Sequence, residues 1–217
     1  MTAGAGRAGV APAVPTPYPG GKRNLDEDTM VAIRSTRLAH DGWLKLRVAT
    51  LSGDDGVAFD REIEDHGPAV AVLPYDPERR TALLVRLPRA PVLFMGAPCD
   101  FPEVPAGLRD DGEDPADCAR REAEEEVGVR LGDVEEAGHV WTMCGVSTER
   151  MHLFLAPYAA EDRTGAGGGL AEEHENITVL EVPLAELRDM ADRNAIADMK
   201  TLALVQTLRL RRPDLFD

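Results

Sequence analysis

Four glutamates lie within five positions of one segment, GLRDDGEDPADCARREAEEEVGV at residues 107–129. At about 100° per residue on a helix, Glu122, Glu125 and Glu126 share one face, whereas Glu124 points elsewhere. Because like charges at this spacing repel each other, such a face needs a compensating positive charge. Carboxylate oxygens on a rigid element suit Mg²⁺ or Mn²⁺, especially when a phosphate-bearing substrate completes the coordination. The spacing predicts a divalent-cation site, and the alternative is a solvated acidic face.

A longer pattern surrounds these glutamates. Its fixed positions follow the spacing Gx5Ex7REUxEExGU, where U is an apolar residue, and are filled by Gly107, Glu113, Arg121, Glu122, Ala123, Glu125, Glu126, Gly128 and Val129. The segment therefore resembles the Nudix box. This resemblance implies an αβα sandwich around a mixed β-sheet, an α/β (α+β) fold. It also implies an enzyme that hydrolyses a nucleoside diphosphate linked to another moiety.

The resemblance assigns roles to individual residues of the box. It implies that Glu122 and Glu126 bind Mg²⁺, with Mn²⁺ as the alternative cofactor, and that Glu125 lies near or in the metal shell. The carbonyl of Ala106, just before the first glycine of the box, is a further implied ligand. Metal ions bridging the pyrophosphate oxygens would neutralise charge and polarise phosphorus toward attack by water.

The helix that carries the box has clear end signals. Asp114 is a typical N-cap followed by proline at the first helical position, and Gly128 favours a left-handed C-cap. We expect Gly107 to allow a tight turn from strand to loop. We expect Glu113 and Arg121 to pair and fix the loop against the helix, and the alternative is two surface charges. Small apolar residues on the neighbouring stripe allow close packing on a sheet: Ala116, Ala119, Ala123 and Val127.

The resemblance extends over roughly residues 35–217. The stretches REIEDHGPAVAVLPYD, LLVRLPR, FPEVPAG, STERMHLFLA, the GGG loop and DMKT are similar to the branch that contains ADP-ribose and GDP-mannose pyrophosphatases. In that branch the N-terminal strands contribute to a homodimer. Two stretches depart from its usual pattern: residues 143–147 replace an SPG-type motif, and Leu87 and Pro88 replace a Gln-aromatic pair before Arg89. These departures affect recognition of the base or sugar more than metal chemistry.

The same resemblance points to residues outside the box. A glutamate on the loop after the LFLA strand would activate water, and Glu175 matches that position best, with Glu173 as the alternative. A solvated acidic loop is the competing interpretation. Arg86, Arg89 and Glu103 could contact the substrate or serve a structural role. The glycines at 165–169 do not form a P-loop and are more typical of a hinge for a lid.

The elements that must position these residues follow from hydrophobic patterning. Two hairpins are expected, one around the GDDG turn at 53–56 and one in which GPAVAVLPYD turns at DPERR into TALLVRL. Residues 90–106 read as a loop with a short strand. Strands are expected at EEAGHVWTM, ERMHLFLAPYAA and ITVLEVP, followed by helices at LAELRDMADRN and ADMKTLALVQTLRLRR. Residues 1–26 read as a disordered tail, 27–66 as an N-terminal β unit for dimerisation, and 67–217 as the Nudix domain.

Composition and net charge limit which classes of binding partner are expected. A formal net charge of −15 and a pI near 4.7 argue against nucleic acid or an anionic membrane surface as a partner. Apolar runs are much shorter than the roughly 20 residues that span a bilayer. Three cysteines without CxxC spacing suggest neither a disulfide framework nor a zinc site. We expect a soluble cytoplasmic protein.

The leading functional hypothesis is Mg²⁺-dependent hydrolysis of ADP-ribose or a nucleotide sugar such as GDP-mannose. The products would be a nucleoside monophosphate and a sugar phosphate. One alternative is a Nudix hydrolase for another nucleoside diphosphate derivative, such as a dinucleotide or coenzyme A. A second alternative is a sensing domain that binds a nucleotide without cleaving it, which the complete set of box carboxylates disfavours.

Overall fold

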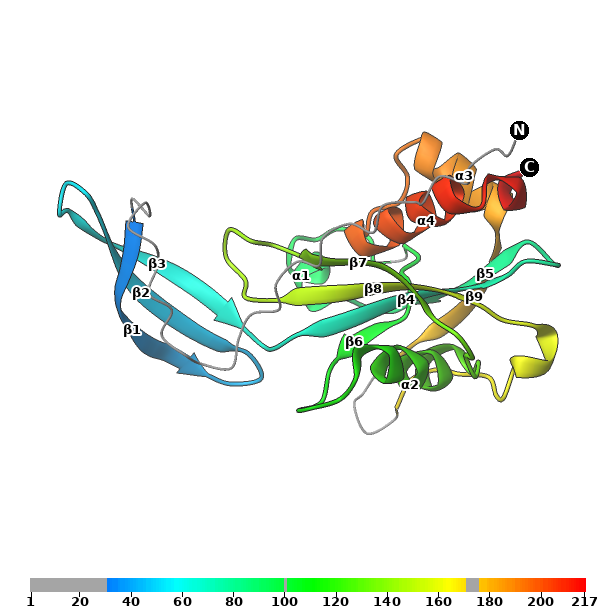
Figure 1. Ribbon diagram of the computed structural model, residues 1–217, viewed down its shortest axis with the longest axis horizontal. Coiled ribbons are helices and arrows are strands. Elements are labelled where there is room, and N and C mark those ends of the chain that lie inside the picture. Colours follow the sequence, from blue (N-terminus) through cyan, green and yellow to red (C-terminus); the bar gives the residue numbers. More distant parts are fainter. Residues whose placement is uncertain (1–30, 100, 171–175) are drawn as a thin grey trace, which may run out of the picture.

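The fold consists of two β-sheets and a set of helices, seen in a computed structural model that describes residues 31–99, 101–170 and 176–217 (Figure 1). The strands are β1 (Val31–Asp41), β2 (Lys45–Gly53), β3 (Ala58–Asp65), β4 (Ala69–Asp76), β5 (Thr81–Arg86), β6 (Ala106–Leu108), β7 (Glu135–Trp141), β8 (Arg150–Pro157) and β9 (Thr178–Pro183). The helices are α1 (Ala90–Phe94), α2 (Pro115–Val127), α3 (Leu184–Asp192) and α4 (Met199–Arg211), with short 3₁₀ turns at Ala160–Asp162 and Pro213–Phe216.

The larger sheet is mixed, with strand order β7-β8-β4-β5-β9 and β6 paired to the start of β4. Strands β4 and β8 run parallel, with Ala69 opposite Met151, and the other pairs are antiparallel. Beyond their shared turn, β4 and β5 separate. The chain from Glu103 to Leu108 fills the gap, bridging to Val85 on one side and to β4 on the other. This insertion carries the segment before the Nudix-like helix into the middle of the sheet.

Helices cover both faces of this sheet, as the αβα expectation requires (Figure 1). Every residue of β4 is buried, which is typical of a strand covered on both faces. One face packs against α3 and α4 through side chains that include Leu84, Leu204 and Leu208. The other face packs against the small apolar stripe of α2, with Val70 and Val85 beneath Ala119 and Ala123. The predicted sandwich is confirmed.

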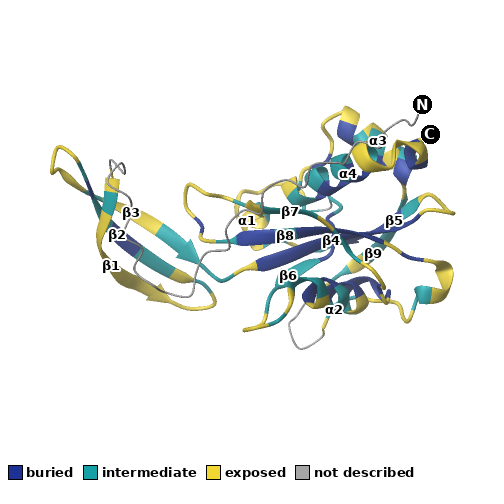
Figure 2. Cartoon of the chain, in the orientation of Figure 1, coloured by how far each residue is buried: buried dark blue, intermediate teal, exposed yellow. Residues whose placement is uncertain are grey.

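The smaller sheet is an antiparallel meander of β1, β2 and β3 that projects from the larger one (Figures 1 and 2). Its junction with the larger sheet is a short parallel bridge between Glu64 and Ser147. There the Glu64 N–H donates to the Val146 carbonyl at 2.8 Å, and the Thr148 N–H donates to the Glu64 carbonyl at 2.9 Å. Figure 2 shows that this sheet is largely exposed, in contrast to the buried strands β4 and β8.

Two local features differ from the sequence expectation or fall outside it. Residues 90–94 form a short helix where a loop was expected, and Pro91 explains this because its fixed φ suits the first helical turn. The short strand expected within 90–106 begins at Ala106 and continues to Leu108. The expected tail at 1–26 lies outside the described residues. None of the helices in the described part of the chain is long and apolar enough to cross a bilayer.

Candidate functional site

Helix α2 has the expected ends. The Asp114 side chain caps it by accepting a hydrogen bond from the Ala116 N–H at 2.8 Å, and Gly128 adopts the left-handed conformation with φ 64°. The helix buries Glu122 and Glu126 together with its small apolar residues, while Glu124 is exposed and pairs with Arg130. The separation of Glu124 from the other glutamates is therefore confirmed.

Arg121 lies at the centre of the acidic cluster. Its guanidinium donates to Glu113 Oε1 at 3.0 Å, to Glu122 Oε1 at 2.8 Å and to Glu125 Oε2 at 3.1 Å. It also donates to the Leu108 carbonyl at 3.2 Å. The hydrogen bond from Arg121 lowers the pKa of Glu113 to about 2. The expected Glu113–Arg121 pair is thus present, and it fixes the loop to the helix.

Two backbone positions of β6 hold the buried glutamates of α2. The Ala106 N–H donates to Glu126 Oε2 at 3.1 Å. Because the N–H and C=O of an extended residue point to the same edge of its strand, the Ala106 carbonyl faces the Glu126 side too. A Cβ built on Gly107 would lie 2.0 Å from Glu122 Oε1. Gly107 is therefore required for the close approach of Glu122. It lies within β6 and its φ is not in the left-handed region, so the observed need for glycine is the space that Glu122 fills.

The glycine-rich loop packs on the C-terminal end of α2. The Gly168 N–H donates to the Glu126 carbonyl at 2.9 Å, and the Gly169 N–H donates to the Glu125 carbonyl at 3.1 Å. A Cβ on Gly167 would lie 2.4 Å from the Glu126 carbonyl oxygen, so this contact needs glycine. The loop thus satisfies helix carbonyls that would otherwise lack donors. The two candidate bases, Glu173 and Glu175, belong to residues 171–175, outside the described residues.

A second charged cluster links the inserted segment to α4. Glu103 is buried and accepts two hydrogen bonds from Arg89, at 2.9 and 2.8 Å, and one from Lys200 Nζ at 2.6 Å. Lys200 also donates to Asp198 Oδ1 at 2.9 Å. Burial alone raises the pKa of Glu103, but Arg89 and Lys200 outweigh it and lower the pKa. Glu103 is therefore ionised and holds the cationic side chains of Arg89 and Lys200 in place.

The structure brings only part of the predicted substrate set together. Arg89 and Glu103 are in direct contact, as described above. Arg86 follows the Val85–Glu103 bridge at the end of β5, opposite Thr178. Among the described residues, no side-chain hydrogen bond or ion pair joins Arg86 to the Glu103 cluster. The hydrogen bond and charge of Glu103 raise the pKa of Arg89, although burial opposes this, and the charge of Glu126 adds to the rise. The Glu103 cluster therefore lies close to the acidic one.

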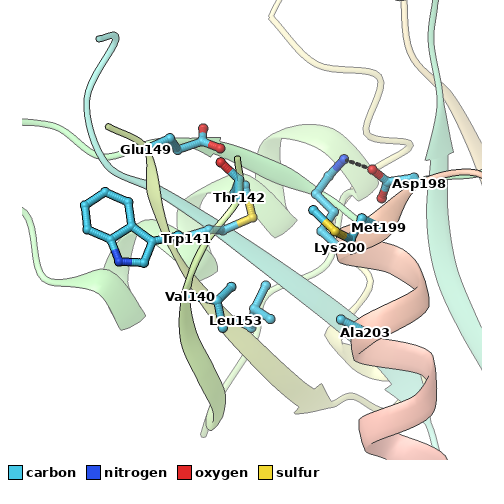
Figure 3. A pocket seen from close by; sticks show the side chains of 10 residues that line it. Val140, Trp141, Thr142, Glu149, Leu153, Asp198, Met199, Lys200 and Ala203 are labelled. Carbon is cyan, nitrogen blue, oxygen red and sulfur yellow. Dashed lines mark hydrogen bonds and ion pairs between the residues drawn. The ribbon is translucent and has the colours of Figure 1, made fainter. Parts of the chain in front are cut away.

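A cavity of about 420 Å³ opens between β7, β8 and the start of α4 (Figure 3). Figure 3 shows Lys200 and Asp198 on one side and Trp141, Thr142 and Glu149 on the other. The remaining lining residues are Val140, Met151, Leu153, Met199 and Ala203. None of these side chains was predicted as a site residue. The DMKT stretch at residues 198–201 is the part of the sequence that could have indicated them. Asp198 N-caps α4 and thereby places Lys200 in the first helical turn.

The acidic cluster suits a hard divalent cation. Three carboxylates, those of Glu113, Glu122 and Glu125, converge on the single guanidinium of Arg121, and Glu126 adds a fourth nearby. Oxygen donors with excess negative charge are the ligand type that Mg²⁺ and Mn²⁺ prefer. Here the side chains contact Arg121 and Ala106. In residues 31–99, 101–170 and 176–217, no three His, Cys, Asp or Glu side chains are gathered at a common metal position.

The chain is similar over most of its length to proteins of one family. A family model for the NUDIX domain matches residues 65–204. A GDP-mannose pyrophosphatase from Cronobacter sakazakii (strain ATCC BAA-894) is 37% identical over 186 residues, covering 83% of this chain and 96% of that protein. One from Escherichia coli O1:K1 / APEC is 32% identical, covering 83% and 95%. A crystal structure of an ADP compounds hydrolase superposes with a TM-score of 0.68 at 19% identity, covering 85% of this chain and 95% of that one.

Proposed function

The chain belongs to the Nudix family, whose members generally use divalent metal ions, and we propose that it hydrolyses the diphosphate bond of a nucleotide sugar or of ADP-ribose with Mg²⁺. GDP-mannose is the first substrate to test, because the two relatives described above carry that activity in their names. The products are a nucleoside monophosphate and a sugar phosphate. The observation that carries the proposal is the cluster of box carboxylates fixed around Arg121 and against β6.

The metal-binding groups in this proposal are the carboxylates of Glu122, Glu125 and Glu126 and the carbonyl of Ala106. A bound Mg²⁺ supplies Lewis-acid chemistry by neutralising charge on the diphosphate oxygens. The chain supplies the rigidity that such chemistry needs. Arg121 holds Glu122 and Glu125, and the backbone of β6 holds Glu126. Fixed donors cost little reorganisation when charge develops in the transition state.

The cavity beside Lys200 is the proposed place for the sugar or the base. Its volume of about 420 Å³ lies within the usual range for small-molecule sites, roughly 300–1,000 Å³. Apolar and aromatic side chains form much of its wall, and Lys200, Asp198 and Glu149 provide polar groups. Arg89 and Lys200, both held by Glu103, place positive charge between this cavity and the acidic cluster. We propose that these cations and Arg86 receive the negative charge of the diphosphate.

The water that attacks phosphorus needs a base. We keep Glu175, with Glu173 as its alternative, for this role. What supports it is the anchoring of the preceding glycines, since Gly168 and Gly169 hydrogen-bond to carbonyls of α2. Those carbonyls belong to Glu125 and Glu126, two of the proposed metal-binding residues.

The small sheet is the proposed dimer surface. Its described residues expose large apolar side chains on a projecting element: Ile33, Leu38, Trp43 and Val57. A second copy of the chain covering them would remove apolar surface from water. The oligomeric state of the protein in solution, measured by light scattering, tests this part, and a monomer at micromolar concentration would contradict it.

The activity is tested by incubating the protein with Mg²⁺ and a panel of substrates. The panel contains GDP-mannose, ADP-ribose, other nucleotide sugars, a dinucleotide and coenzyme A. We expect a nucleoside monophosphate and a sugar phosphate from GDP-mannose or ADP-ribose, identified by chromatography. Cleavage of only the dinucleotide or coenzyme A would replace the substrate assignment. Tight binding without cleavage of any compound would favour a sensing domain.

A further inference from the structure

His66 connects the two sheets at their junction. Its ring nitrogen Nε2 lies 2.9 Å from Glu149 Oε2, and Nδ1 forms a short hydrogen bond with Glu64 Oε1. All three side chains are largely buried, with 14–21% of their surface exposed. Glu64 belongs to β3 of the small sheet, whereas Glu149 precedes β8 of the larger sheet. The histidine therefore bridges two carboxylates from separate parts of the fold.

The hydrogen-bond chemistry of this bridge requires a charged ring. A neutral imidazole has one N–H donor and one acceptor nitrogen, whereas an ionised carboxylate only accepts. Both ring nitrogens of His66 face carboxylate oxygens, so only the imidazolium can donate to Glu64 and Glu149 at once. A neutral ring would direct a lone pair at one of the two carboxylates, and two partly buried negative charges would remain without a cation between them.

The other groups around the ring agree with a positive charge. Trp43, from the turn between β1 and β2, stacks on the ring with centroids 5.3 Å apart, and an aromatic face attracts a cation. The carboxylate of Asp65, the residue after Glu64 in β3, forms an ion pair with Arg47 and accepts a hydrogen bond from the Thr148 hydroxyl. Burial lowers the pKa of His66, but the hydrogen bonds and charges of Glu64 and Glu149 outweigh it and raise the pKa above its ordinary value.

One of these carboxylates also belongs to the cavity. Glu149 lines it opposite Lys200 (Figure 3). The backbone next to Glu149 is tied to the small sheet through Val146 and Thr148, which hydrogen-bond to Glu64. Two connections therefore run from His66 to the cavity wall, one through the Glu149 side chain and one through this backbone segment.

We propose that protonated His66 is a positioning residue that clamps Glu149 into the wall of the cavity and joins the small sheet to it, and that loss of the proton loosens this wall. The effect on substrate binding rests on the proposed function of the cavity. The clamp itself does not, because it is defined by contacts among His66, Glu64 and Glu149. As pH rises through the raised pKa of His66, KM should rise while kcat changes less. The stability that the clamp contributes should be fully present below pH 6.5 and lost over the same rise.

The clamp is tested first by NMR of the whole chain labelled with ¹⁵N. We expect both ring nitrogens of His66 to be protonated at pH 6.5, with the resonance assigned by its absence in His66→Gln. We also expect the amide signals of residues 146–149 to shift with the same midpoint. A neutral His66 at pH 6.5 would overturn the proposal. It would also be overturned if the amide signals of residues 146–149 did not shift as His66 titrates. Neither result depends on whether any substrate is cleaved.

Kinetics then test the link to the cavity. For the wild type we expect KM for the cleaved substrate to rise roughly tenfold across the titration, equivalent to losing one charge-assisted hydrogen bond. His66→Gln should show the high KM at every pH, and His66→Arg, which keeps the charge, should show a low and flat KM. His40→Gln, which changes an exposed histidine of the same sheet, is the matched control and should follow the wild type. Equal pH profiles for the wild type and His66→Gln would overturn the link. If no substrate is cleaved, the proposed function fails, and the NMR result still decides the clamp.

Discussion

Replacing Gly107 by alanine should disable the site by displacing one carboxylate. The added Cβ would lie 2.0 Å from Glu122 Oε1, 2.2 Å from Cδ and 2.5 Å from Oε2. Ordinary van der Waals contact begins at 3.4 Å, so the nearest oxygen must move by about 1.4 Å, the difference between 3.4 and 2.0 Å. Glu122 is buried and bonded to Arg121, so the move also disturbs the centre of the acidic cluster.

The size of the effect follows from that displacement. A misplacement of about 1 Å can cost roughly 10²-fold in rate, which corresponds to about 2.7 kcal/mol in the activation barrier at 1.36 kcal/mol per factor of ten. We therefore expect Gly107→Ala to lose at least about 10²-fold in kcat. Overpacking should also lower the free energy of unfolding by about 1–3 kcal/mol.

Steady-state hydrolysis and urea unfolding measure both effects. Gly132→Ala is the matched control, because a Cβ there meets nothing within 4 Å and Gly132 is not in the left-handed region. The control should keep its activity and stability. Wild-type kcat in folded Gly107→Ala would refute the argument that Glu122 must occupy the space beside Gly107.

Three other perturbations test neighbouring parts of the structure. The Glu113–Arg121 pair should stabilise the fold above pH 4.5 and lose this contribution as pH falls from 4.5 toward the folded-state pKa of about 2. The stability gap between wild type and Glu113→Gln in urea unfolding should therefore shrink over that range, and a constant gap would contradict it. The buried Val104 N–H donates to Thr201 Oγ1 at 2.8 Å, and Thr201→Val removes this acceptor. The free energy of unfolding should therefore fall by about 1–3 kcal/mol in urea unfolding. An unchanged value would show that this hydrogen bond does not hold the inserted segment. Lys200→Met should raise KM by roughly tenfold through loss of one charged contact, whereas Lys45→Met at the exposed end of β2 should not; equal KM values would remove Lys200 from the binding site.

Local signals in the sequence were enough to predict helix α2. Its N-cap Asp114 and its C-cap Gly128 act within one turn of the helix ends, so the residues around them determine the boundaries. The periodicity that separates Glu124 from the buried glutamates is equally local. The all-buried strand β4 was visible as a continuous apolar run, since helices cover both its faces.

Contacts between distant residues could not be predicted in the same way. Lys200 and Glu103 are 97 residues apart, and their pairing depends on the insertion of residues 103–108 between β4 and β5. The glycine-rich loop was predicted to be a hinge because its composition indicates a backbone with much conformational freedom. Composition does not reveal the groups that the loop contacts, which are backbone carbonyls of α2. The contact beside Gly107 could not be predicted for a related reason: the sequence indicates that a side chain is missing but not which group fills the space.

The clearest test of the proposed activity compares two glutamates of the same helix, two positions apart, in one assay. The release of GMP from GDP-mannose with Mg²⁺ should be measured for wild type, Glu126→Gln and Glu124→Gln. Glu126→Gln should lose about 10³-fold, since metal-derived charge stabilisation is worth several kcal/mol. Glu124→Gln should stay within about twofold of wild type, because the Glu124 side chain is exposed and forms a surface ion pair with Arg130. If the wild type releases no GMP, the same comparison is made with ADP-ribose and the release of AMP. Equal rates for the two variants, or no nucleoside monophosphate from either substrate with the wild type, would contradict the proposed activity.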